Sequence, residues 1–128
     1  MRITSLPFEL DRDEAHGFRV PADEIHGIIR VEPDAILVSF EVEGDADDGF
    51  THLARIPVAD VVRIELTGGA VKSPRLMLEV ARDEILEALP WADGCLCVVR
   101  FRRADAVHAQ DLVTEIEVRM AEVNTRKD

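Results

Sequence analysis

Apolar residues at alternate positions mark most of this chain as a series of short β-strands. The clearest strand is predicted at 36–43, where apolar side chains face one way and polar side chains the other. A second strand is predicted at 25–32, and the Glu-Pro-Asp turn at 32–34 joins the two as a hairpin. The inward residues of the clearest strand are Ile36, Val38, Phe40 and Val42.

The same alternation predicts strands elsewhere along the chain. Residues 61–67 place Val62, Ile64 and Leu66 on one face. Residues 57–60 indicate a turn or a single helical turn, and residues 82–91 fit a short helix or, as we favour, a short strand or irregular edge. Six to seven strands at about ten-residue spacing favour an antiparallel sandwich or barrel. The other predicted strands are 6–10, 17–20, 52–57, 75–81 and 94–102.

The last part of the chain differs, because its apolar residues recur in steps of three and four. This spacing predicts one amphipathic helix over about 104–123, with Asp105 as N-cap or first-turn acid. The strand before it turns Cys95, Cys97, Val99 and Phe101 towards the core. The opposite face of the helix is acidic and should face solvent. The apolar stripe must then be buried, and we expect it to cover an open part of the sheet. The stripe consists of Ala106, Ala109, Leu112, Val113, Ile116, Met120 and Val123.

Several short motifs, in this order, resemble those of uncharacterised bacterial pleckstrin-homology-like domains. They are Gly-Ile-Ile-Arg-Val-Glu at 27–32, Ile-Pro-Val-Ala-Asp-Val-Val-Arg-Ile-Glu-Leu at 56–66, Leu-Pro at 89–90, and Arg-Arg-Ala-Asp at 102–105 leading into the helix. The similarity extends from about residue 26 to 121. The resemblance implies a mainly β fold (α+β by content), a strongly bent antiparallel sheet or barrel capped by the C-terminal helix. It implies no specific activity.

Length and charge limit the range of functions. The 128 residues predict one domain, with residues 1–24 forming N-terminal strands and 124–128 a polar tail. A net charge of −11 repels phosphate backbones and anionic lipid, so we expect neither nucleic acid nor a membrane as partner. No apolar run is typical of a signal peptide or long enough to span a bilayer. With only two cysteines, a cytoplasmic location is expected.

No motif predicts catalysis, a metal or a cofactor. The acidic residues Glu41, Glu43, Asp45, Asp47 and Asp48 lack the spacing of a calcium loop and indicate a solvated segment. Cys95 and Cys97 lack the partners of a zinc site and are interpreted as small core residues. The four histidines are scattered, and no nucleophile elbow is present. We therefore expect a protein that is not an enzyme.

Two features are candidates for contact with a ligand or partner. Arg100, Arg102 and Arg103 form a basic cluster, interpreted either as an anion or phospho-ligand pocket or, as we favour here, as charge balance with carboxylates on neighbouring strands. Trp91 either plugs the open end of the barrel, which we favour, or contacts a partner. The expected function is a cytoplasmic interaction or scaffolding domain that binds a protein or itself. The alternative is a small-anion or phospho-ligand domain that uses the three arginines.

Overall fold

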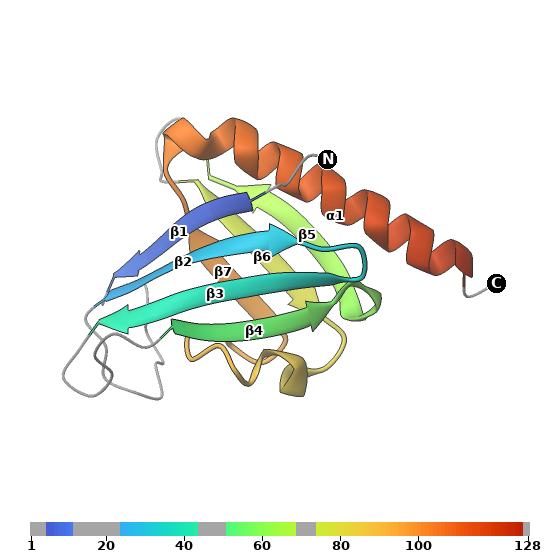
Figure 1. The fold of residues 1–128 in the computed structure, drawn as a ribbon, viewed down its shortest axis with the longest axis horizontal. Coiled ribbons are helices and arrows are strands. Elements are labelled where there is room, and N and C mark those ends of the chain that lie inside the picture. The colour runs from blue at the N-terminus through green and yellow to red at the C-terminus, as the bar shows by residue number, and fades with distance from the viewer. Residues whose placement is uncertain (1–4, 12–23, 44–50, 69–73, 127–128) are drawn as a thin grey trace.

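The computed structural model describes residues 5–11, 24–43, 51–68 and 74–126. Seven antiparallel strands form one sheet in the order β4-β3-β2-β1-β7-β6-β5, and one long helix lies against it (Figure 1). The elements are β1 (Ser5–Asp11), β2 (Glu24–Val31), β3 (Ala35–Glu43), β4 (Thr51–Pro57), η1 (Val58–Asp60), β5 (Val61–Thr67), β6 (Arg75–Val80), η2 (Asp83–Leu86), β7 (Leu96–Arg100), η3 (Arg103–Asp105) and α1 (Ala106–Arg126).

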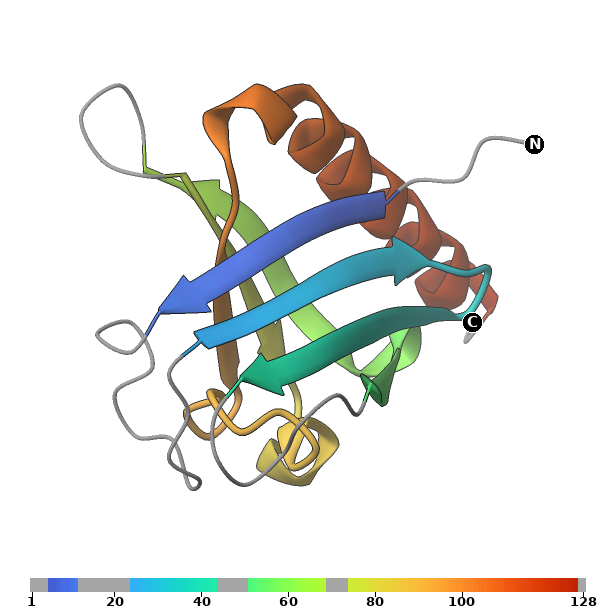
Figure 2. The same ribbon diagram turned by 60° about the vertical axis from the view of Figure 1, so that its left-hand side comes forward.

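The sheet bends so that its two halves face each other. Figure 2 shows strands β1 to β3 crossing in front of β5 to β7, with α1 along one end. The predicted fold class is confirmed: the chain is mainly β, with an antiparallel sheet capped by one C-terminal helix. The buried side chains come from the inward face of every strand and from one stripe of the helix. On α1 this stripe is Ala109, Leu112, Val113 and Ile116, with Met120 and Val123 partly buried against the core.

The predicted inward faces of most strands are correct, but that of β5 is partly wrong. The register of β5 against β6 shifts between Val61 and Arg63, which is the signature of a β-bulge. One extra residue reverses the alternation. Val61 is therefore buried and Val62 exposed, the opposite of the predicted arrangement, and Ile64 returns to the core.

Three predicted elements also need correction. Of the interpretations of 82–91, the short helix is correct, and the short strand or irregular edge that we favoured is not: η2 is followed by turns, and Leu86 and Leu89 are buried. The last strand ends at Arg100, and η3 separates it from α1, which begins at Ala106 and continues to Arg126. The strand predicted at 17–20 and the acidic segment at 44–48 lie outside the described residues.

The two cysteines are free, and only Cys97 is fully buried. Burial raises the pKa of the Cys97 thiol to about 12, although a hydrogen bond donated by Trp91 Nε1 to its Sγ, at 3.3 Å, acts in the opposite direction. The unfolded chain ionises this thiol near pH 8.5, as free cysteine does. The folded protein holds this proton more tightly than the unfolded chain does, and the difference stabilises the fold at pH values below that point. This contribution to stability is lost as the pH rises from about 9 to 12.

We accordingly expect Cys97 to be inert towards a thiol reagent at pH 8 until the protein unfolds, because the reacting species is the thiolate. Counting modified thiols with a chromogenic disulfide should give at most one in the native protein and two in denaturant. In Cys95→Ser the native count should fall to zero. Rapid modification of Cys97 in folded Cys95→Ser would contradict the packing described above.

Candidate functional site

A cleft of about 690 Å³ opens where β1 and β7 separate. The two strands pair at a single position, Glu9 with Arg100, whereas all seven residues of β1 pair with β2. Pro7 lies two residues before Glu9 and has no N–H to donate, so β1 cannot supply a complete ladder to a second neighbour there. After Arg100 the chain has no further pairing with β1, and the cleft lies between this segment and β1.

The segment after Arg100 is held in a defined path on the far side of the cleft. The Phe101 N–H donates to the Pro74 carbonyl at 3.2 Å, and the Asp105 N–H donates to the Arg102 carbonyl at 2.8 Å. Phe101 is buried, which anchors this segment in the core. Arg100, which precedes Phe101, and Arg102 and Arg103, which follow it, are consequently held at the cleft.

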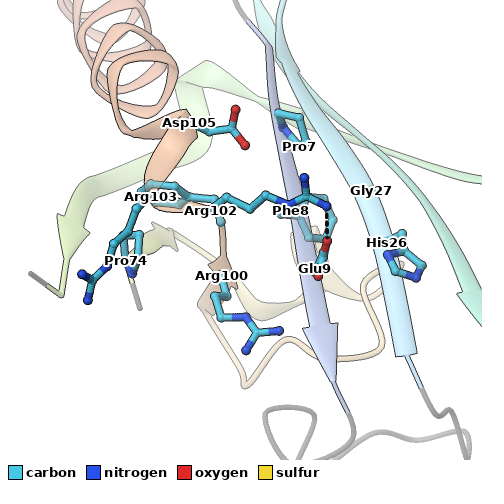
Figure 3. Close-up of a pocket in the computed structure, with 11 residues that line it drawn as sticks. Pro7, Phe8, Glu9, His26, Gly27, Pro74, Arg100, Arg102, Arg103 and Asp105 are labelled. Carbon is cyan, nitrogen blue, oxygen red and sulfur yellow. Dashed lines mark hydrogen bonds and ion pairs between the residues drawn. The ribbon is translucent and has the colours of Figure 1, made fainter. Parts of the chain in front are cut away.

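Arg100, Arg102 and Arg103 all line this cleft, as do Pro7, Glu9 and His26. Figure 3 shows Arg102 directed towards Glu9, whereas the guanidinium group of Arg103 lies beside Pro74 and points away from Glu9. Arg102 reaches across the opening and its Nη2 lies 3.2 Å from Oε1 of Glu9, a partner 93 positions away in the sequence. This ion pair gives Arg102 the carboxylate partner on a neighbouring strand that the charge-balance interpretation predicts. The only other carboxylate lining the cleft within the described residues is that of Asp105.

The cleft lies at the centre of a row of polar side chains that crosses all seven strands. Arg100 is in register with Glu9 on one side and with Arg75, which does not line the cleft, on the other. The Thr51 hydroxyl at the far end of the row donates to Glu41 at 3.2 Å. In sheet order the row is Thr51, Glu41, His26, Glu9, Arg100, Arg75 and Thr67.

The structure does not bring Trp91 to this site. The ring is only 8% exposed and packs between Phe8, at 5.6 Å between centroids, and Phe40, at 5.0 Å. Trp91 is thus part of the core, as the plug interpretation predicts, and it offers almost no surface to a partner. The site residues that the sequence did not reveal are Glu9, His26 and Pro74. Among the lining residues, Pro7, a proline inside an alternating strand, could have indicated an interrupted ladder, but no prediction was made from it.

Within the described part of the chain, no group of three or more His, Cys, Asp or Glu side chains could hold a metal ion. No described helix is long and apolar enough to cross a membrane. Comparison of the chain with family models, with curated proteins and with solved structures gave no match. The inference about function therefore rests on the geometry and charge of the cleft.

Proposed function

We propose that this protein is a non-enzymatic cytoplasmic binding domain whose cleft between β1 and β7 takes an anionic group, a phosphate or a carboxylate. The observation that carries the proposal is the placement of Arg100, Arg102 and Arg103 around one cleft in a protein of net charge −11. Guanidinium groups present several N–H donors in a planar fork that matches the oxygens of phosphate and carboxylate. The cleft gathers this chemistry in a chain with 26 acidic and only 15 basic residues.

The ion pair already present in the cleft does not oppose ligand binding strongly. Arg102 and Glu9 make a single contact, and their side chains are 76% and 35% exposed. An exposed pair of this kind contributes about 0.2–1 kcal/mol, and solvent screening places it at the low end. A phosphate that offers Arg102 two oxygens can replace the Glu9 carboxylate at small cost. Glu9 therefore competes with the ligand for Arg102.

The charge of the whole protein favours a small or singly placed anion over a long polyanion. At about 0.1 M salt, charges more than roughly 10 Å apart are largely screened from each other. A single phosphate in the cleft therefore senses mainly the neighbouring arginines. A nucleic acid would extend beyond them over acidic surface and be repelled.

The proposal predicts that inorganic phosphate or pyrophosphate raises the midpoint of thermal unfolding more than chloride does at matched ionic strength. The double variant Arg102→Ala/Arg103→Ala should lose this difference, with an association constant lower by about tenfold or more, which corresponds to roughly 1.4 kcal/mol or more. Arg55→Ala is the matched control, because Arg55 is also exposed on the sheet and paired with a carboxylate, Asp34, at 3.1 Å. An equal response in the double variant and the wild type would refute the proposed site.

Glu9→Gln is expected to strengthen anion binding, by up to about fivefold, because it frees Arg102 from an exposed ion pair worth up to about 1 kcal/mol. Isothermal titration calorimetry with pyrophosphate measures the change. Glu41→Gln removes the same charge from the same polar row two strands away, so it corrects for the effect of net charge alone. Equal affinities of the two variants would mean that Glu9 does not compete for the ligand.

A further inference from the structure

A row of four residues, three of them apolar and one the small polar Ser39, leads out of the cleft across the outer face of the sheet and is called the apolar row below. Pro7, which lines the cleft, is in register with Ile28 on β2; Ile28 is in register with Ser39, and Ser39 with Leu53 on β4. Ile28 is 45% exposed and Leu53 is 64% exposed. Four strands about 4.8 Å apart give this apolar row a length of roughly 14 Å.

The apolar row has charged rows on both sides. One is the polar row through Glu9, His26 and Glu41, displaced by two residues along each strand. The other carries Arg30 and Arg55 on either side of Leu37, which is only 9% exposed. On the solvent face of an antiparallel sheet, polar residues are expected at every such position. Single exposed apolar residues are common on protein surfaces, but here they line up, and the line begins at the basic cleft.

The size and charge of this surface select the kind of occupant. A length of about 14 Å matches roughly four residues of extended chain, at about 3.3 Å each. The arginines at one end require an anionic group there. An isolated small anion would leave the apolar row uncovered. A second copy of this chain, with a net charge of −11, would be repelled by the first, and an anionic membrane would be repelled for the same reason.

We infer that the cleft and the apolar row together bind an extended segment of a partner protein, in which an acidic or phosphorylated residue is followed by large apolar residues. The inference rests on the proposed anion site and names its partner. The anionic residue meets the arginines beside Pro7, and the following apolar side chains lie against Ile28 and Leu53. Burial of those apolar side chains provides affinity, and the charged end fixes the direction of the segment.

Selection of random peptides displayed on phage against the intact protein tests this inference. The enriched peptides are expected to share an acidic residue followed by at least two large apolar residues. Their synthetic versions, measured by fluorescence anisotropy, should bind Leu53→Ser and Arg102→Ala each about tenfold more weakly than wild type. Val62→Ser is the control, since Val62 is 55% exposed on β5, away from the row. A phosphorylated version of an enriched peptide, compared with its acidic form, distinguishes the two sources of charge.

Three results would overturn the inference: no enrichment, enriched peptides without this pattern, or equal binding by Leu53→Ser and wild type. A dimer in sedimentation velocity that Leu53→Ser converts to a monomer would also overturn it, because a second copy would then cover the row. Leu53→Ser should keep the full stabilisation by phosphate. If phosphate stabilises both Leu53→Ser and wild type but no peptide binds the wild type, the anion site is supported and only the inferred partner is wrong. If phosphate does not stabilise the wild type, the anion site itself is wrong.

Discussion

Ile116→Asp is expected to abolish cooperative unfolding of the domain. Ile116 is completely buried at the centre of the stripe by which α1 closes the sheet. It lines an apolar void of about 10 Å³ together with Ile29 and Ile64, and such a void is too small to hold more than one water molecule. An unpaired carboxylate there costs several kcal/mol, out of a total stability of about 5–15 kcal/mol for a typical domain.

Val118→Asp is the matched control, because Val118 lies two residues further along the same helix and is 48% exposed. Urea denaturation followed by circular dichroism should show a normal transition for Val118→Asp. Ile116→Asp should give no transition or a broad one at low urea. A folded Ile116→Asp protein with a sharp transition near that of the wild type would show that α1 does not cap the core in the manner described.

Gly27→Ala is expected to destabilise the fold by about 1–3 kcal/mol, the range for overpacking a well-filled site. Gly27 faces Phe8 on β1 and Phe40 on β3. A Cβ at this position would lie 2.6 Å from the Ser39 carbonyl oxygen and would also overlap the Phe8 ring. That ring cannot move aside freely, because its other neighbour is Trp91.

Gly94→Ala provides the comparison for this effect. Gly94 has a φ of +62°, and a Cβ there would meet no atom within 4 Å. Its substitution therefore costs only the left-handed backbone conformation, about 1–2 kcal/mol. Denaturation in urea should show that both variants are less stable than wild type, Gly94→Ala by no more than about 2 kcal/mol and Gly27→Ala by up to about 3 kcal/mol. A Gly27→Ala protein as stable as wild type would mean that Phe8 does not lie across Gly27.

Much of the fold could be predicted from the sequence because burial follows simple periods. The alternation in β3 and the three- and four-residue steps in α1 identify their inward faces directly. Val62 was assigned to the wrong face because a bulge inserts one residue and reverses the period. Residues 83–86 were assigned to a strand because a short apolar run has no period long enough to distinguish strand from helix.

The candidate site was predicted less completely, for a different reason. The proximity of Arg100, Arg102 and Arg103 follows from their sequence positions. The ion pair of Arg102 with Glu9 does not, since it depends on how β7 and β1 meet in the bent sheet. The apolar row from Pro7 to Leu53 is also invisible in the sequence, because it runs across strands and exists only in their register.

The central claim is that the cleft between β1 and β7 is an anion site, and its most direct test is a titration of the isotope-labelled protein with pyrophosphate followed by ¹H–¹⁵N correlation spectra. The account predicts that the largest shifts occur at the amides of residues 100–105 and of Phe8 and Glu9, with saturation at a single dissociation constant. Shifts that are absent, or that centre on the exposed face of α1 or on the β5 edge, would contradict it.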